Sequence, residues 1–158
     1  VRDNIAVLSR YSYGWQLKPV IRGHAEAVGP VAERLREIGE ERWTCVFCKR
    51  ALLQAAARVA DEFDAHGIVM GDALGQVASQ TLPNMEVISH GIEKPILRPL
   101  IGLDKSEIVD LARHIGTFEV STRSEVRCAF LPPNPITRAS VDRLLDVARR
   151  LDEEAAPA

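Results

Sequence analysis

The sequence contains little that would assign it to a membrane, to the extracellular space or to nucleic acid. No apolar run approaches the roughly 20 residues of a membrane helix. No signal peptide precedes the first apolar run, so we expect a cytoplasmic protein. The formal net charge of −2 provides no global basic field to attract RNA or DNA.

Aromatic residues and cysteines are also scarce. Unpaired RNA is usually read by aromatic rings and arginine planes, and only 5% of the chain is aromatic. RNA affinity is therefore expected to be weak and to come from a local patch or another domain. Three cysteines, an odd number, argue against a secreted disulfide scaffold.

The remaining composition is that of an ordinary globular protein. The chain has 158 residues, of which 46% are hydrophobic and 27% charged, enough for one domain with a full core. We predict a single domain over residues 1–151 and a disordered tail over residues 152–158.

Apolar patterning predicts alternating strands and helices. Short apolar runs predict extended segments over residues 4–9, 17–23, 67–73, 85–91 and 94–103. Helical spacing predicts helices over residues 25–38, 48–63, 105–115 and 141–151, the third opened by the capping box "DKSE". The proline-rich residues 131–137 predict no regular element. This order implies an α/β fold with a mainly parallel sheet flanked by helices on both faces.

Two cysteines stand at the start of the second predicted helix. The stretch "WTCVFCKRALLQAAARVA" begins at Trp43 and contains Cys45 and Cys48. A helix N-terminus suits a redox dithiol, whereas a zinc site needs four ligands and no histidine has the right spacing. An iron–sulfur cluster takes cysteine thiolates, and buried core cysteines are common. Spacing alone leaves these alternatives open.

The most distinctive stretch is "MGDALGQVASQT", residues 70–81. Sites in α/β sheets lie at the carboxyl ends of strands, which directs attention to Gly71 and the loop after it. Gly71 and Gly75 allow a ligand to approach the backbone. Ser79, Gln80 and Thr81 supply neutral groups that suit a base or ribose edge. An ordinary strand-to-helix loop would explain the same residues.

The third cysteine, Cys128, lies in "EVRCAFLPPNP" beside a proline-rich loop. The neighbouring Arg123 and Arg127 would favour a low-pKa thiolate. A structural role is the alternative.

Four segments in this order resemble the ThiI family, the tRNA 4-thiouridine synthetases. They are "TCVFCKR", "GDALGQVASQT", "LRPLIGLDKSEI" and "RCAFLPPNPITR". The resemblance covers roughly residues 17–140 and is to the catalytic domain. It implies a PP-loop ATP-pyrophosphatase fold, of the adenine nucleotide alpha hydrolase-like type, truncated at its N-terminus. The family's THUMP and rhodanese regions are not part of the match.

The resemblance implies a reaction and residues for it. Members of the family use ATP, normally with Mg²⁺, to adenylate O4 of a tRNA uridine, and a sulfur nucleophile then displaces AMP. By motif, Lys49 would meet phosphate, while Gly71 and Gln80 would lie toward the adenosine. Cys128 matches the sulfur-handling cysteine. In members without rhodanese, the trio Cys45, Cys48 and Cys128 is expected to ligate an iron–sulfur cluster.

The sequence departs from the family at its phosphate-binding loop, Ser-Gly-Gly-x-Asp-Ser. Ser9 follows the first apolar run, but Arg10 and Tyr11 stand where glycines are expected. Bulky side chains there would block the amides that cradle phosphate. Alternatively, this run is the family's second strand and the loop lies outside the chain. In both cases we expect a shortened sheet with an exposed edge, covered by a homodimer or a partner chain.

Three functions are compatible with these patterns. The first is ATP-dependent sulfur transfer to tRNA uridine, completed by a separate THUMP or PP-loop polypeptide and a sulfur donor. The second is a non-catalytic iron–sulfur or nucleotide-binding module. The third is sulfur transfer for thiamine thiazole synthesis. We favour the first, with no membrane partner.

Overall fold

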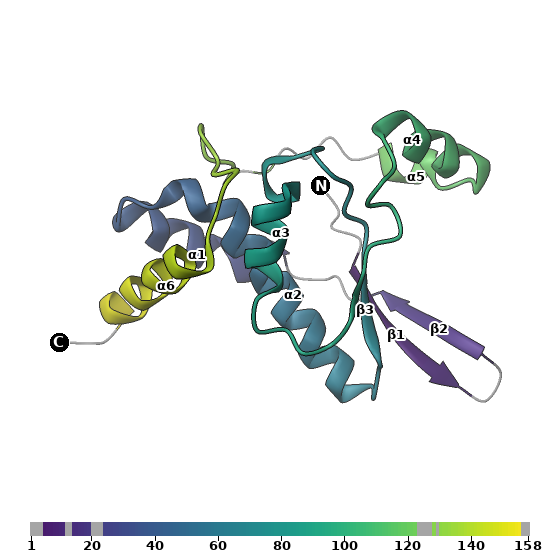
Figure 1. Cartoon of the computed structure of the whole chain (residues 1–158), viewed down its shortest axis with the longest axis horizontal. Helices are drawn as coiled ribbons and strands as arrows, with labels where there is room; N and C mark the ends of the chain where they lie inside the picture. Colours follow the sequence, from purple (N-terminus) through teal and green to yellow (C-terminus); the bar gives the residue numbers. More distant parts are fainter. Residues whose placement is uncertain (1–4, 12–13, 20–23, 123–127, 129, 156–158) are drawn as a thin grey trace.

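The structure is a computed structural model that describes residues 5–11, 14–19, 24–122, 128 and 130–155 (Figure 1). Its elements in chain order are β1 (Ile5–Tyr11), β2 (Gly14–Pro19), α1 (His24–Glu37), η1 (Glu41–Trp43), α2 (Thr44–Glu62), β3 (Gly67–Met70), η2 (Ala78–Gln80), α3 (Leu82–Ser89), β4 (Ile96–Leu97), α4 (Lys105–His114), α5 (Phe118–Thr122) and α6 (Val141–Ala155), where η denotes a 3₁₀ helix.

The described strands form one mixed sheet in the order β2-β1-β3-β4. The α/β class is confirmed, but the expectation of a mainly parallel sheet is corrected for these strands. β1 pairs antiparallel with both β2 and β3, and only β3 and β4 run parallel. Only residues 12 and 13 separate β1 from β2, which is too short for a crossover and long enough for a hairpin. Helix α3 provides the crossover between β3 and β4.

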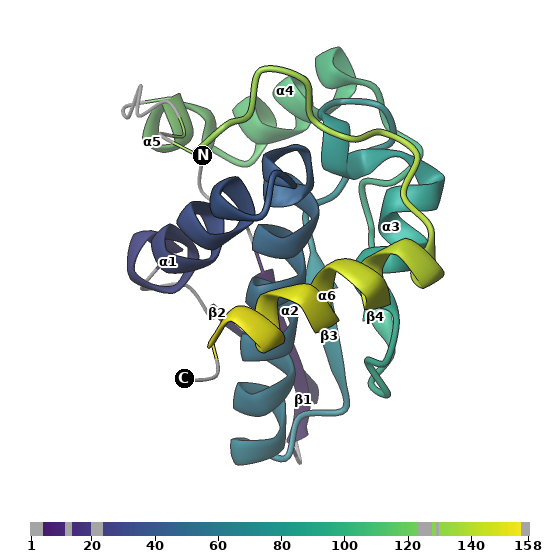
Figure 2. The ribbon, with the colours of Figure 1, turned by 90° about the vertical axis from the view of Figure 1, so that its left-hand side faces the viewer.

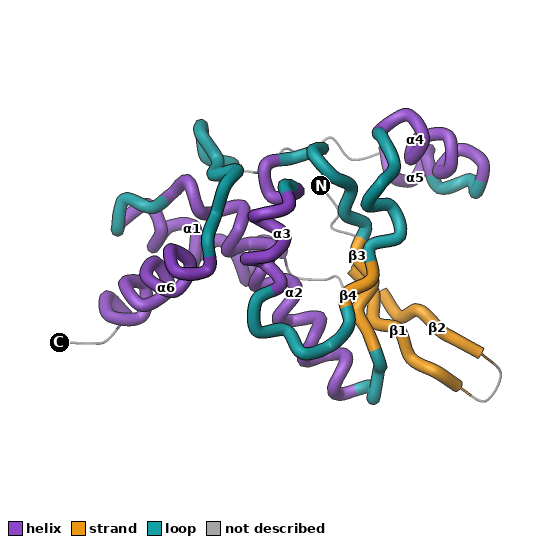
Figure 3. The backbone as a smooth tube through the Cα atoms, viewed as in Figure 1, coloured by secondary structure: helices purple, strands orange, loops and turns teal. Residues whose placement is uncertain are grey.

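The main helices lie on one side of this sheet. Helix α2 packs against β1 and β3, and α1 and α3 pack against α2. Figures 1 and 2 show α1, α2, α3 and α6 together on that side, while α4 and α5 lie beyond one end of the sheet. Figure 3 shows the orange strands to one side of the purple helices α1, α2, α3 and α6. The expectation of helices on both faces is therefore wrong for the described elements.

The core lies between the sheet and these helices. Ile68 and Met70 of β3 are 0% and 1% exposed, and they contribute to one cluster with α2 and α6. Side chains alternate along a strand, so two β3 residues two apart bury the same face. In α6, Leu144 and Val147 are buried at helical spacing.

The predicted helices are present, with small differences at their ends. The capping box that opens α4 is confirmed, since Asp104 accepts from the Glu107 amide at 3.0 Å and Glu107 accepts from the Asp104 amide at 2.8 Å. Gly116 ends this segment with a φ of +73°, which glycine adopts without strain. Helix α6 continues to Ala155, so residues 152–155 of the expected disordered tail are helical. Residues 156–158 lie outside the described part.

Two predicted extended segments are wrong or shortened. Residues 85–91 were expected to be extended, yet most of them belong to helix α3. Thr81 caps this helix by accepting from the Asn84 amide, and a proline stands in its first turn, where helices tolerate it. In residues 94–103 only Ile96 and Leu97 form a strand. As expected, residues 131–137 contain no helix or strand.

The segment expected to end in a phosphate loop is strand instead. Ser9, Arg10 and Tyr11 continue β1 and pair with Gln16, Trp15 and Gly14 of β2. The backbone of residues 9–11 is hydrogen-bonded to β2. This favours the alternative alignment, in which residues 4–9 correspond to the family's second strand. Of the second apolar run, residues 20–23 lie outside the described part.

None of the helices in the described part of the chain combines the length and the apolar character that a membrane crossing requires.

Candidate functional site

The candidate site lies where the two parallel strands end. Gly71 and Asp72 follow β3 directly, and Arg98 follows β4 directly. Carboxyl ends of parallel strands meet at one edge of a sheet, where α/β proteins bind their ligands. Helix α2 contributes Lys49 from its second turn, and η2 contributes Gln80.

A buried carboxylate joins these elements. Asp72 Oδ1 accepts from Lys49 Nζ at 3.0 Å and from Gln80 Nε2 at 3.3 Å. Its other oxygen, Oδ2, accepts from Arg98 Nε at 3.3 Å. The side chain of Asp72 is only 5% exposed, compared with 13% for Lys49 and 17% for Arg98. One aspartate therefore connects α2, β3, η2 and β4.

The pKa of the Asp72 carboxyl reflects two opposing effects. Burial raises it, because a charged group is poorly solvated inside the protein. The charge of Lys49 and the hydrogen bonds from Lys49, Gln80 and Arg98 outweigh burial, so the pKa lies below that of an ordinary aspartate. The carboxylate is thus ionised at neutral pH.

The two residues that the resemblance predicts to lie toward the adenosine, Gly71 and Gln80, lie beside this carboxylate. Gly71 is adjacent to Asp72 in the chain and is exposed. Gln80 is 9% exposed, and its Oε1 is a buried acceptor without a partner in the described structure. A buried polar atom without a partner is costly, and a ligand N–H or O–H group would satisfy it. Gly75, with a φ of +73°, turns the intervening loop and donates its amide to the Gln80 carbonyl at 2.9 Å.

Sequence reasoning selected Lys49, Gly71 and Gln80, and the structure places them together. It missed Asp72 and Arg98, although both stand in the segments that carry the resemblance, "MGDA" and "LRPL". An aspartate directly after a buried strand was the available signal. No local pattern pairs it with an arginine 26 residues later; the parallel pairing of β3 and β4 does so.

Two of the cysteines lie beside Lys49 in the first turns of α2, and the third lies on the loop before α6. Cys45 and Cys48 are half-buried, and Cys128 is exposed. Burial raises the pKa of Cys45, and the charge of Cys128 raises it further, so the two thiols are within electrostatic reach. The three cysteines form no disulfide. Arg123 and Arg127, expected beside Cys128, lie outside the described residues.

The described side chains do not form a metal cage as they stand. Within residues 5–11, 14–19, 24–122, 128 and 130–155, no three His, Cys, Asp or Glu side chains are close enough to hold one ion. The trio Cys45, Cys48 and Cys128 therefore does not fit an iron–sulfur cluster in this arrangement. Both oxygens of Asp72 are likewise committed to protein donors.

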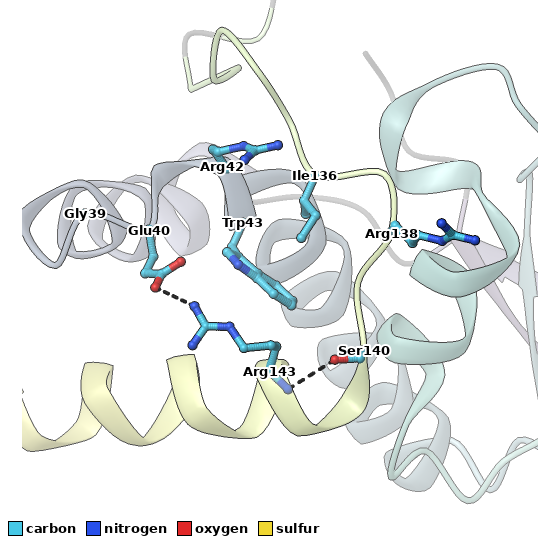
Figure 4. A pocket seen from close by; sticks show the side chains of 8 residues that line it. All are labelled: Gly39, Glu40, Arg42, Trp43, Ile136, Arg138, Ser140 and Arg143. Atoms are coloured by element: carbon cyan, nitrogen blue, oxygen red, sulfur yellow. Dashed lines mark hydrogen bonds and ion pairs between the residues drawn. The ribbon is translucent and has the colours of Figure 1, made fainter.

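A cavity of about 240 Å³ lies away from these residues, between η1, the loop before α6 and the start of α6 (Figure 4). Trp43 projects into this region, and Arg143 beneath it donates to Glu40 at 2.8 Å. Glu40 also accepts from Arg150 at 2.6 Å. Glu40 thus links two arginines of α6 to the end of α1, so we interpret the cavity as part of the packing of α6.

Comparisons with known proteins agree with the resemblance. The model of the family described as "Thiamine biosynthesis protein (ThiI)" matches residues 1–152. A probable tRNA sulfurtransferase of Methanocaldococcus jannaschii is 44% identical over 96% of this chain and 39% of its own length. One of Thermococcus kodakarensis is 48% identical over 84% of this chain and 35% of its own length. The chain thus spans less than two fifths of the length of these curated relatives.

A solved structure is also similar. It is a crystal structure of a 4-thiouridine synthetase–RNA complex with bound ATP, with a TM-score of 0.63 and 29% identity over 85% of this chain and 43% of that one. A likeness at this level supports the PP-loop ATP-pyrophosphatase type of α/β fold.

Proposed function

Because this chain belongs to the ThiI family, we propose that it carries the nucleotide-binding and sulfur-handling part of an ATP-dependent tRNA sulfurtransferase that forms 4-thiouridine. The observation that carries this proposal is the convergence of Lys49 and Gln80 on Asp72, beside Gly71, at the carboxyl ends of β3 and β4. A related protein was solved with ATP and RNA.

The chemistry needs a good leaving group on the uridine. O4 attacks the α-phosphorus of ATP and pyrophosphate leaves, so the base carries AMP. A sulfur nucleophile then adds at C4, and AMP departs with the oxygen. Lys49 would stabilise negative charge on the phosphates, and Gln80 would accept from the adenosine. Mg²⁺ would enter with the phosphates, which commonly supply its ligands.

Cys128 would handle the sulfur. It is exposed and lies within electrostatic reach of Cys45. Iron–sulfur ligation by Cys45, Cys48 and Cys128 remains a separate prediction from the resemblance. A brown colour and labile sulfide after anaerobic reconstitution would support it, and a colourless protein without iron would contradict it.

Completion by another polypeptide is part of the proposal. Positions 9–11 pair in a hairpin and provide no phosphate loop. We therefore expect the loop, most of the tRNA affinity and the sulfur donor to come from elsewhere, either a partner chain or a second copy. A non-catalytic nucleotide-binding module is the alternative that the same observation favours.

Calorimetry with ATP and Mg²⁺ tests the nucleotide site. We expect the chain to bind ATP, and Lys49→Ala and Gln80→Ala to weaken binding at least about tenfold each. No binding at millimolar ATP would contradict the proposed site. Thiouridine formation from tRNA, ATP and a sulfur donor only after a loop-bearing partner is added would separate the enzyme from the inactive module.

A further inference from the structure

The residues that follow Cys128 are attached to three other elements. Residues 130–139 form a strap that leads from Cys128 toward α6. Its first residue, Phe130, packs on α1, where a Cβ at Gly29 would lie 3.4 Å from the ring. Leu131 donates its amide to the Cys128 carbonyl at 3.4 Å. The exposed thiol of Cys128 therefore stands at one end of a segment that is anchored directly behind it.

The middle of the strap is attached to η1. Arg42 Nε donates to the Asn134 carbonyl at 2.8 Å, and the Arg42 carbonyl accepts from the Ile136 amide at 3.0 Å. η1 continues directly into α2, and Arg42 stands three residues before Cys45. These bonds join the strap to the start of the helix that carries Cys45.

The end of the strap is attached to the segment that follows Gln80. Thr81 Oγ1 donates to the Thr137 carbonyl at 2.7 Å. One turn later, the fully buried Asn84 accepts from the Ala139 amide at 2.9 Å. Because Thr81 is adjacent to Gln80, one short segment carries both a residue of the candidate nucleotide site and an anchor of the strap.

The thiols and the candidate site share one face of α2. Cys45 and Lys49 are four residues apart in this helix, and side chains at that spacing are neighbours on the same face. Lys49 reaches Asp72 from this face, and Cys45 lies within electrostatic reach of Cys128. Cys128 is therefore held near the helix face that leads to the nucleotide site.

We propose that the strap sets the distance between the sulfur-handling Cys128 and the bound nucleotide, and that Thr81 and Arg42 are the positioning residues that hold the strap. This inference rests on the proposed function, because it needs a nucleotide beside Gln80 and a sulfur step at Cys128. A sulfur nucleophile and an activated base react only when they meet in the right orientation. Anchors on η1 and at the start of α3 supply that fixed geometry.

Affinity labelling of the whole chain tests this distance. The probe is 5′-chloroacetamido-5′-deoxyadenosine, an adenosine whose electrophilic carbon stands near the place of the α-phosphate and whose chloride a thiolate displaces. Peptide mass spectrometry over time gives the maximal labelling rate and the probe concentration at half of that rate. We expect saturable labelling of Cys128 that ATP suppresses. Iodoacetamide, which needs no nucleotide site, should label Cys128 without saturation.

Replacement of Thr81 removes one anchor. Thr81→Asp keeps an acceptor that can cap α3 but has no hydroxyl to donate to Thr137. The maximal labelling rate of Cys128 should fall about fivefold, as for one lost hydrogen bond, and the half-saturating probe concentration should change less than about twofold. Thr81→Ser keeps the donor and should restore the rate. Iodoacetamide should react with Cys128 equally in all these variants, because the thiol is exposed.

Arg42→Ala tests the other anchor and remains informative if Thr81→Asp does not fold. It removes the bond to Asn134, and the maximal labelling rate of Cys128 should again fall about fivefold. Arg36→Ala is the matched control, since Arg36 is an exposed arginine in the last turn of α1. It should change neither the rate nor the half-saturating concentration.

The outcomes separate this inference from the proposed function. If the chain binds ATP but the probe does not label Cys128, the thiol is not held beside the nucleotide and the inference is overturned. If Thr81→Asp and Arg42→Ala are labelled as fast as the unchanged chain, the strap does not set the distance, and the nucleotide site stands alone. If the probe and iodoacetamide slow by the same factor, the change is in the thiol itself and the inference is also overturned. If the chain binds no ATP, both proposals fail.

Discussion

At the scale of single residues, the site depends on Asp72. This carboxylate is nearly fully buried, yet it stays ionised because it accepts from Lys49, Gln80 and Arg98. Removing it would take this carboxylate away from two largely buried cations. Loss of one partner of a buried ion pair is among the few single changes that cost several kcal/mol.

Asp72→Asn should lower the free energy of unfolding by on the order of 3 kcal/mol at pH 7. The pKa of Asp72 is lowered in the folded state, so its contribution is present above the unfolded pKa of about 3.9 and is lost as pH falls through the folded value. Denaturation curves from pH 7 to pH 2 should therefore show the difference from the unchanged chain shrinking at acid pH. Asp152→Asn, an exposed replacement, should differ little at any pH. A difference for Asp72→Asn that stays constant down to pH 2 would contradict the assignment.

The thiols give a second prediction at this scale. Burial and the charge of Cys128 both raise the pKa of Cys45, so Cys45 should react with iodoacetamide more slowly than the exposed Cys128. Cys128→Ser removes that charge and should lower the pKa of Cys45, which speeds its alkylation at pH 8 to 9. Peptide mass spectrometry over time measures both rates. An unchanged rate for Cys45 would mean that the two thiols do not interact.

At the scale of elements, the side chains of Asn84 in α3 and of its N-cap residue Thr81 attach the loop before α6 to this helix. Asn84 is 0% exposed, and its Nδ2 donates to the carbonyls of Ala78 and Ile136 at 2.7 and 2.8 Å. Its Oδ1 accepts from the Ala139 amide at 2.9 Å. Thr81 adds a bond to the Thr137 carbonyl at 2.7 Å. These bonds fix a proline-rich loop that has no hydrogen-bond ladder of its own.

Asn84→Ala should therefore cost about 3 kcal/mol or more, because it leaves several buried backbone groups without partners. Thermal denaturation measures the cost, and hydrogen exchange at the Ala139 amide should become much faster. Glu86→Ala, on the exposed side of the same helix, is the matched control and should change stability by less than about 0.5 kcal/mol. Equal stability of the two variants would show that Asn84 does not hold the loop.

At the scale of the whole molecule, the described helices cover one side of a mixed sheet (Figures 1 and 2). Helix α4 has no buried residue, and its Leu111 and Ile115 are 42% and 61% exposed. The chain also spans less than two fifths of the length of its curated relatives. Helix α4 therefore packs against α5 and still leaves these two apolar side chains open to solvent.

Ligand binding should be visible in the stability of the whole chain. ATP at about a hundred times its dissociation constant adds about 2.7 kcal/mol to the free energy of unfolding. For a chain of this size the melting temperature should rise by roughly 5–10 °C. Differential scanning fluorimetry with ATP and Mg²⁺ measures the shift, and Gln80→Ala should reduce it. A melting temperature independent of ATP would argue against a nucleotide site in the isolated chain.

The sequence predicted the features that depend on local patterns. The periodicity of α1, α2, α4 and α6 and the capping box at Asp104 were readable because neighbouring residues decide them. Residues 85–91 were misassigned, since an apolar run of strand length cannot be told from a buried helix by periodicity. The side chains of Thr81 and Asn84 decide that case through contacts with distant residues.

The sequence by itself determined the family and the α/β class and predicted the site residues Lys49, Gly71 and Gln80, because four motif segments and helical spacing are local properties of the chain. Only the tertiary structure decided that β1 runs antiparallel to β3, that the described helices cover one side, and that Arg98 meets Asp72. The physical reason is that strand order and long-range ion pairs depend on which distant segments pack together. No local propensity brings together two residues that are 26 positions apart in the chain; the parallel pairing of β3 and β4 does so.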